Sequence, residues 1–189
     1  VTFDGEGTQN ITSGGSNFYN LDIANTSETT VYLQDALDVD GDLTIEEDST
    51  LDAGENEKDD SNGYSINIAG NWDNKGEFVH NENTVTFDGE GNEQYITSGG
   101  SNFYNLDIAN TSDDTVYLQD DLNVDGNLTI EEGSALDLNE YNLYVGEDFS
   151  NNGTLKLVGI EDVDFTNDTD SGLVEYYGTE DYYYDYDNY

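Results

Sequence analysis

Hydrophobic and polar residues alternate in many short segments of this chain. The clearest are Leu-Asp-Ile at 21–23, Leu-Asp-Val at 37–39, Leu-Thr-Ile at 43–45 and Ile-Asn-Ile at 66–68. A period of two predicts a strand with one buried face and one face in water. No helix-length window shows the spacing of an amphipathic helix. The pattern therefore predicts an all-β protein.

Clusters of Gly, Asn, Asp and Ser separate these segments, for example at 13–16, 40–42 and 151–153. Such residues tolerate positive φ and satisfy their own backbone in tight turns. Short strands at regular spacing, separated by turns, are typical of a β-sandwich, a barrel or a solenoid. Alternation and turns alone do not decide between these three architectures.

A long internal repeat favours the solenoid. Residues 11–27 recur unchanged at 96–112, and the Val-Thr-Phe-Asp-Gly-Glu-Gly of 1–7 recurs at 85–91. Similar sequences can follow one another in a solenoid because each coil stacks on the previous one. We therefore predict a parallel β-solenoid (β-helix) built from internal repeats of about 85 residues. Two β-sandwich domains in tandem are the alternative, which the near-continuous strand signal and the lack of a linker disfavour.

The repeat divides the chain into two units and the opening of a third. Repeat unit one covers 1–84 and repeat unit two covers 85–173. Residues 174–189 form either the start of a third repeat, because Val-Glu-Tyr-Tyr-Gly echoes Val-Thr-Phe-Asp-Gly, or a tyrosine-rich docking end. All three are expected to stack as one continuous solenoid. The chain starts within a repeat motif, which predicts a mature or trimmed product.

The charge is extreme. The chain has 44 Asp and Glu against 3 Lys and no Arg, for a net charge of −41. Nucleic-acid backbones and anionic membranes are bound by clustered Lys and Arg, so neither is expected as a partner. No apolar run approaches the length of a membrane span, so membrane insertion is not expected. With no Cys, the chain has neither a disulfide framework nor a thiolate metal site.

Four short motifs occur in order in unit one: Thr-Phe-Asp-Gly-Glu-Gly at 2–7, Phe-Tyr-Asn-Leu-Asp-Ile at 18–23, Gly-Asp-Leu-Thr-Ile at 41–45 and Gly-Asn-Trp-Asp-Asn-Lys-Gly at 70–76. With these motifs the chain resembles the β-helical repeat stalks of bacterial and archaeal cell-surface proteins, including filamentous-haemagglutinin-like adhesins. The resemblance covers most of the chain. It implies an extracellular, cell-surface structural role and carries over no catalytic residue.

A weak metal site is one candidate for chemistry. Asp38, Asp40 and Asp42 are closely spaced, and Asp125 is retained at the equivalent place in unit two. Calcium prefers several carboxylate oxygens, but the spacing does not fit an EF-hand, and a polar turn after a strand explains these residues more simply. No cofactor is required on this interpretation. Calcium or other divalent cations are the candidate ligands, bound weakly over the whole acidic surface.

Six Asn-x-Ser/Thr sequons make the chain a candidate glycoprotein. Asn25 and Asn110 are the favoured acceptors, since they hold equivalent places in a loop between strands. The candidate acceptors are Asn10, Asn25, Asn110, Asn127, Asn152 and Asn167.

The tyrosine-rich end is a candidate interface because Tyr combines a large apolar area with a polar tip. We expect an extracellular structural protein, a subunit or segment of a surface fibre or adhesin stalk that assembles head to tail with copies of itself. A filament results when such contacts do not close. The candidate interface residues are Tyr176, Tyr177, Tyr182, Tyr183, Tyr184 and Tyr186.

Two other functions are open. A glycan-binding adhesin module would use aromatic residues such as Trp72 on cell-surface glycans, although Trp72 and Phe149 are more simply explained as core aromatics. A polysaccharide-degrading β-helix enzyme is more remote. It needs a pair of carboxylates at a set separation, and no acidic cluster unique to one unit suggests such a cleft. The sequence therefore does not predict an enzyme.

Overall fold

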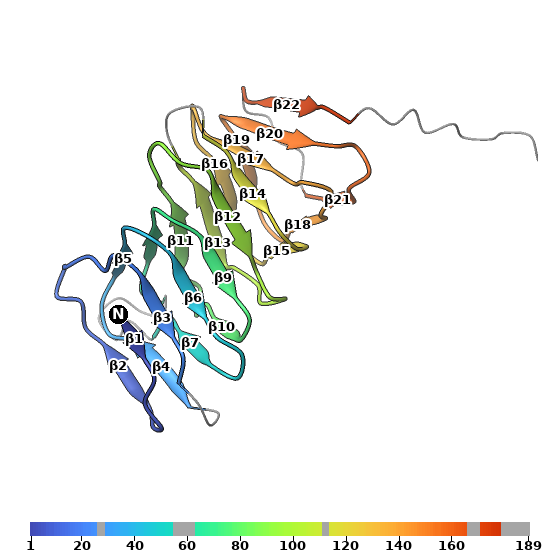
Figure 1. Ribbon diagram of the computed structural model, residues 1–189. Coiled ribbons are helices and arrows are strands. Elements are labelled where there is room, and N and C mark those ends of the chain that lie inside the picture. The colour runs from blue at the N-terminus through green and yellow to red at the C-terminus, as the bar shows by residue number, and fades with distance from the viewer. Residues whose placement is uncertain (26–28, 55–62, 111–113, 166–170, 179–189) are drawn as a thin grey trace, which may run out of the picture.

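The computed structural model describes residues 1–25, 29–54, 63–110, 114–165 and 171–178. In this part of the chain, short strands wind into a parallel β-solenoid of about seven turns, each about 21 residues long (Figure 1). Every pair of neighbouring strands is parallel. The prediction of a parallel solenoid is confirmed. The tandem sandwich alternative is wrong, because sandwich sheets are antiparallel.

The solenoid has three faces, which we call A, B and C. Face A is one nine-stranded sheet that runs the length of the molecule. Its strands, in spatial order, are β1 (Thr2–Phe3), β3 (Leu21–Ile23), β6 (Leu43–Ile45), β9 (Trp72–Asn74), β12 (Gln94–Thr97), β14 (Val116–Leu118), β17 (Ala135–Asp137), β20 (Thr154–Leu157) and β22 (Leu173–Tyr176).

Face C is a six-stranded sheet. Its strands are β5 (Leu37–Val39), β8 (Ile66–Ile68), β11 (Thr84–Phe87), β13 (Asn105–Ile108), β16 (Leu128–Ile130) and β19 (Phe149–Asn151).

Face B consists of two sheets that follow one another along the same side (Figure 1). Between them, the Phe78 N–H donates to Ser101 Oγ at 3.1 Å, and Phe103 forms an isolated bridge with Val124. The lower strands are β2 (Gln9–Ile11), β4 (Thr30–Leu33), β7 (Thr50–Asp52) and β10 (Glu77–Val79), and the upper strands are β15 (Leu122–Val124), β18 (Leu143–Val145) and β21 (Val163–Asp164).

One core fills the space between the three faces. In most strands the buried residues alternate with outward ones, as the period of two predicts. Residues of similar kind stack on one another from turn to turn, for instance Ile68, Phe87 and Ile108 on face C, which are all fully buried. Buried side chains from both sequence units belong to a single hydrophobic cluster. The two units therefore share one continuous core.

The turn, and not the longer sequence repeat, is the repeating unit of the structure. Leu21 lies on face A, whereas its sequence equivalent Leu106 lies on face C. Between them the chain makes three full turns, from β3 through β6 and β9 to β12, and then passes two further faces. Ile11 and Ile96 show the same shift, from face B to face A. Each sequence repeat is therefore rotated by one face relative to its copy.

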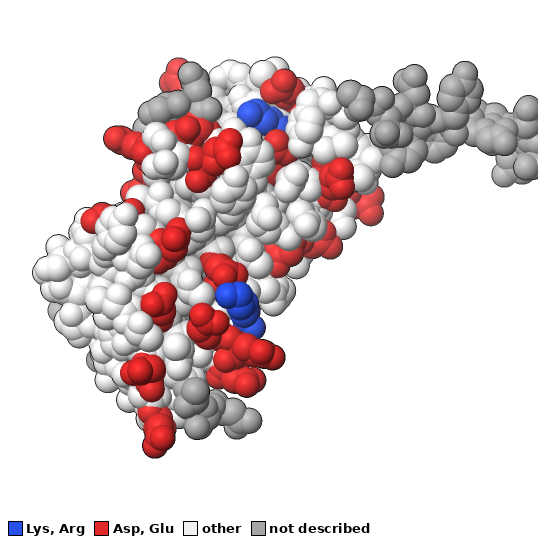
Figure 2. Space-filling view, viewed as in Figure 1, with Lys and Arg blue, Asp and Glu red and all other residues white. Residues whose placement is uncertain are grey.

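The outward positions show how the fold accommodates its negative charge. Wherever a register pair between the described strands contains a carboxylate, the residue opposite is uncharged or basic. On face A, Thr44 separates Asp22 from Asp73, and on face C, Asp107 lies between Thr86 and Thr129. Like charges directly opposite each other would destabilise the sheet. The carboxylates on the viewed side are accordingly scattered in small groups (Figure 2).

Candidate functional site: the ends of the solenoid

The C-terminal end of the solenoid carries most of the exposed apolar residues. The described residues include ten large hydrophobic side chains that are exposed, and six of these lie between positions 160 and 177. A soluble surface usually scatters such residues singly, so a concentration at one end points to an interaction surface. The six are Ile160, Val163, Leu173, Val174, Tyr176 and Tyr177.

Two of these residues are exposed because no further turn of the described part of the chain covers them. In β22, Val174 is paired with Leu155 of β20, and Tyr176 is paired with Leu157. Leu155 and Leu157 point into the core and are 1% and 3% exposed, whereas Val174 and Tyr176 are 45% and 70% exposed. Parallel in-register neighbours point the same way, so Val174 and Tyr176 extend the core column beyond its last covered layer.

Among the described residues, the N-terminal edge of face A is uncovered as well. In β1, Phe3 is paired with Ile23 and lies half-buried against the core, and Val1 at the start of this strand is 63% exposed. The outer edge of β1 has no strand beside it among the described residues. An open edge exposes unpaired N–H and C=O groups, which can pair with another chain.

Of the tyrosines expected at an interface, Tyr176 and Tyr177 lie at this C-terminal end, while Tyr182, Tyr183, Tyr184 and Tyr186 lie outside the described residues. The Tyr177 hydroxyl donates a 2.8 Å hydrogen bond to Asp137 Oδ1, which ties the last turn to β17. Partial burial and this bond to the carboxylate raise the pKa of Tyr177 far above its ordinary value. Tyr177 therefore stays a neutral donor.

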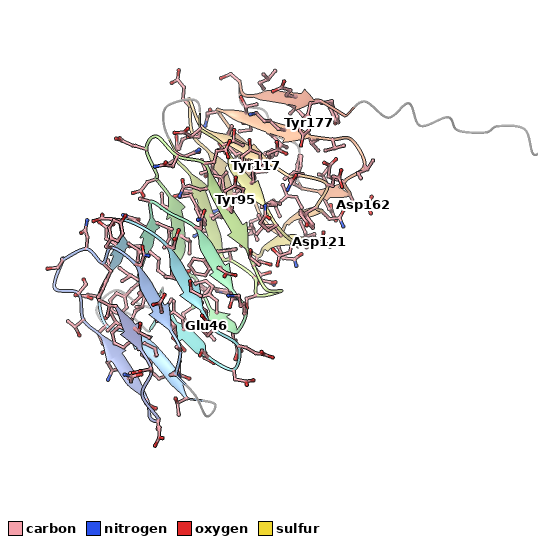
Figure 3. All side chains as sticks on the ribbon, in the orientation of Figure 1. Glu46, Tyr95, Tyr117, Asp121, Asp162 and Tyr177 are labelled. Carbon is pink, nitrogen blue, oxygen red and sulfur yellow. The ribbon has the colours of Figure 1, made fainter. Side chains whose placement is uncertain are left out.

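A second set of tyrosines lies along the side of the solenoid. Tyr95 and Tyr117 are register neighbours on face A, and their rings stack with centroids 5.6 Å apart. Figure 3 shows Tyr95, Tyr117 and Tyr177 in sequence along this face. Tyr95 also donates from its hydroxyl to Glu93 at 2.8 Å. The turns thus align aromatic side chains that are far apart in the sequence.

The structure does not gather the four candidate calcium ligands. Asp38 lies in β5 on face C, whereas Asp125 follows β15 on face B, where it accepts from Asn102 at 2.8 Å and lies 3.4 Å from His80. Asp40 accepts from the Asn17 amide at 2.8 Å. Among the described residues no group of three or more metal-ligating side chains is close enough to hold an ion.

Asp42 has a structural role that sequence reasoning missed. Its Oδ1 accepts the backbone N–H of Asn71 in the next turn at 2.9 Å, and its own N–H donates to Asn20 Oδ1 at 3.1 Å. Asn71 continues the series by accepting from the Tyr95 N–H. Each Asx side chain of this ladder therefore satisfies a backbone donor of the turn above it.

Two more ladders of the same kind stand at the other corners. At the entry to face C, Asn105 accepts from the N–H of Asn127, and Asn127 accepts from that of Asp148, each at 3.0 Å. At the entry to the upper part of face B, Asp121 accepts from Asn142 and Asn142 accepts from Asp162, at 2.9 and 2.8 Å. Figure 3 shows Asp121 and Asp162 on the same side of the molecule. The sequence signal was the recurrence of Asn or Asp just before strands once per turn.

The Gly-Gly turns are held by carboxylates from the following turn. Asp120 accepts from the N–H groups of Ser98 and Gly99, both at 2.7 Å. Asp35 accepts from Ser13 and Gly14 in the same way, at 2.8 and 2.7 Å. Burial on its own raises the pKa of Asp35, but the hydrogen bonds from Ser13 and Gly14 together outweigh it, so the pKa is lowered. Part of the acidic content is therefore committed to fixing turns.

The two favoured glycosylation sites are buried. Asn25 and Asn110 have no exposed surface, and their amide nitrogens donate to the carbonyl oxygens of Thr29 and Asp114. A glycan on either nitrogen would require this hydrogen bond to break and the side chain to become exposed. Of the others, Asn10 and Asn152 are exposed and Asn127 is half-buried, whereas Asn167 lies outside the described residues. Glycosylation itself stays a prediction.

The aromatic residues considered for sugar stacking lie in the core. Trp72 is 1% exposed and packs against Phe78 and Phe103, with ring centroids 4.8 and 5.2 Å away. Phe149 is 6% exposed and contacts Phe165. Neither side chain is accessible to a glycan, so both act as core aromatics, as the simpler interpretation holds.

The chain matches no known family model, no curated protein and no solved structure. The β-solenoid fold is thus established from the structure, and the resemblance to adhesin stalks stays a prediction. The described residues include no helix with the length and apolar character needed to cross a membrane.

Proposed function

We propose that this chain is a structural segment of an extracellular surface fibre or adhesin stalk, which extends by stacking of turns end to end. The observation that carries this proposal is the open C-terminal end. Val174 and Tyr176 continue a core column whose preceding members, Leu155 and Leu157, are buried. A further turn would remove this apolar area from water, the main favourable term in protein association.

The contrast between ends and sides supports the same function. Carboxylates are distributed over the side of the solenoid seen in Figure 2, and repulsion between like charges disfavours lateral association. At the C-terminal end, six exposed apolar residues lie between positions 160 and 177. This distribution favours growth along the axis over growth across it. Divalent cations are proposed to assist by screening the net charge of −41, without a dedicated site.

The proposed function is tested by electron microscopy and sedimentation of the purified chain, with and without a calcium chelator. We expect elongated particles whose length increases with protein concentration. A variant with Val174→Asn and Tyr176→Asn should assemble at least tenfold more weakly. The matched control, Tyr95→Asn with Tyr144→Asn, removes two exposed aromatic residues from the sides and should assemble normally. Monomers at every concentration, in both cation conditions, would refute the function.

A glycan-binding adhesin module is the second candidate, and the stacked pair of Tyr95 and Tyr117 favours it. Aromatic rings at the surface are a common element of carbohydrate contacts because they combine apolar area with a polar tip. Binding on a glycan array that is lost in a Tyr95→Ala variant, but kept in the end variant above, would support this function. Absence of binding on the array would leave the structural role as the better account.

A further inference from the structure

The chain contains one strand sequence in two different surroundings. Val-Thr-Phe occurs at residues 1–3, where β1 forms the N-terminal edge of face A, and at 85–87, within β11 of face C. Each copy has a Leu-Asp-Ile strand on one side. Val85 is paired with Leu106 and Phe87 with Ile108, just as Phe3 is paired with Ile23 in the first copy. The two copies are therefore equivalent on that side.

On the other side the two copies differ. β11 is also paired with β8, whose Ile66 and Ile68 face Val85 and Phe87. All four side chains are fully buried. β1 has no such neighbour among the described residues, and Val1 is 63% exposed. The internal copy thus shows what this strand accepts on its open edge: a parallel strand with two inward apolar residues, two positions apart.

β22 offers such a strand at the opposite end. Its inward residues are Val174 and Tyr176, two positions apart, and both are exposed on the side away from β20. β22 and β1 belong to the same face, so a second copy stacked above the first can continue face A by bringing these two strands together. The local sequences, Val-Glu-Tyr at 174–176 and Val-Thr-Phe at 1–3, also align apolar on apolar.

We propose that β1 of a second copy of this chain docks on β22 in parallel, with Val1 opposite Val174, Thr2 opposite Glu175 and Phe3 opposite Tyr176. The proposal rests on the proposed end-to-end function and specifies its interface. The inward pairs continue the hydrophobic core across the junction, as Val85 and Phe87 do within the chain.

The charges fit this register. Glu175 would lie between Lys156 of its own chain and Thr2 of the second copy, so no carboxylate would face another. Every register pair of the described strands follows the same rule, for example Thr2 opposite Asp22 on the covered side of β1. A shift by two residues would place Asp4 opposite Glu175 and break the rule.

Cysteine cross-linking of the full chain tests the register, because the natural sequence has no Cys. Directly opposed residues of parallel strands lie about 5 Å apart, within the range that a disulfide spans. A Thr2→Cys variant mixed with a Glu175→Cys variant should give a disulfide-linked dimer under mild oxidation. Asp4→Cys with Glu175→Cys is the matched control, and its yield should be at least tenfold lower, since a two-residue offset exceeds disulfide range.

A charge variant gives an independent check without oxidation. Thr2→Glu, made together with Asp22→Asn so that no like-charge pair arises within the chain, would put a carboxylate opposite Glu175 of the other copy and should weaken assembly about tenfold. Glu175→Gln should restore assembly of this double variant. If the unmodified chain assembles but cross-links equally through Asp4→Cys, or only through other positions, this register is wrong while the proposed function stands. If the chain does not assemble at all, both are refuted.

Discussion

Leu21 and Leu106 hold the same place in two copies of one sequence motif, yet Leu21 lies on face A of the solenoid and Leu106 on face C. Both are fully buried, Leu21 paired with Leu43 and Leu106 lying between Val85 and Leu128. A given motif therefore fits either face. What the motif requires is a turn above or below it, rather than a particular side of the molecule.

This relationship shows which features of the fold can be predicted from the sequence and which cannot. Alternation correctly predicts strands such as Leu37–Val39 and Ile66–Ile68, together with their buried faces, because period two is a local property. The number of residues per turn depends on how many corners close one circuit, which alternation does not encode. The sequence repeat consequently suggested a unit of about 85 residues, whereas the structure repeats about every 21.

The candidate site shows the same division. The sequence indicated an apolar, tyrosine-containing end, and Tyr176 and Tyr177 lie there. The sequence predicted exposed positions for Asn25 and Asn110, whereas both side chains are buried and donate to the Thr29 and Asp114 carbonyl oxygens. Such hydrogen bonds depend on the backbone path, which composition does not reveal.

The close approach of turns at a glycine corner gives the first prediction. A Cβ on Gly70 would lie 2.4 Å from the Gly41 carbonyl carbon, so Gly70→Ala forces two turns apart. We expect it to lower the free energy of unfolding by about 1–3 kcal/mol. Urea unfolding followed by the fluorescence of Trp72, the single tryptophan, measures this loss. Gly7→Ala is the control, because no atom lies within 4 Å of its added Cβ. Equal stabilities of both variants would contradict the prediction.

The separation of carboxylates predicts a charge-dependent loss at Thr44. Thr44→Asp would place three carboxylates in one column with Asp22 and Asp73. We expect it to destabilise the fold by about 0.5–1 kcal/mol at low salt, and by less at 1 M salt, where screening is strong. Thr44→Asn, of similar shape but uncharged, should behave like the natural chain at both salt concentrations. A loss from Thr44→Asp that is independent of salt would mean that shape, not charge, is responsible.

The half-buried carboxyl of Asp107 predicts a pH effect of definite sign. Burial raises the pKa of Asp107 above its ordinary value of 3.8, a hydrogen bond from Thr129 opposes this, and Glu131 adds to it. The folded state therefore holds this proton more tightly than the unfolded state, and this group contributes less stability as pH rises through its folded pKa. Asp107→Asn should raise the melting temperature at pH 7, with a gain that shrinks as the pH falls toward 3.8.

Asp35 serves as a control, because its pKa is shifted in the opposite direction from that of Asp107. Comparing the two separates the pKa effect from a general effect of removing a negative charge. Because hydrogen bonds from Ser13 and Gly14 lower its pKa despite partial burial, its contribution is present above pH 3.8 and is lost as the pH falls through its folded pKa. Asp35→Asn should lower the melting temperature at pH 7 and have little effect in strong acid. If both Asn variants shifted the melting temperature in the same direction at pH 7, the assignment of these two carboxyls would be wrong.

The hydrogen bond between Tyr177 and Asp137 should stabilise the last turn locally and contribute little to the stability of the whole fold. Tyr177→Phe removes the 2.8 Å hydrogen bond that ties the last turn to β17 but keeps the ring. We expect amide hydrogen exchange in Leu173–Tyr176 to become about two- to fivefold faster, since a partly exposed hydrogen bond contributes little net free energy. Exchange in the central strand β13 (Asn105–Ile108) of face C should not change, because its opening requires disruption of the shared core. Faster exchange in both segments would show that the last turn and the core unfold together, and a single cooperative unit would then extend to the open end.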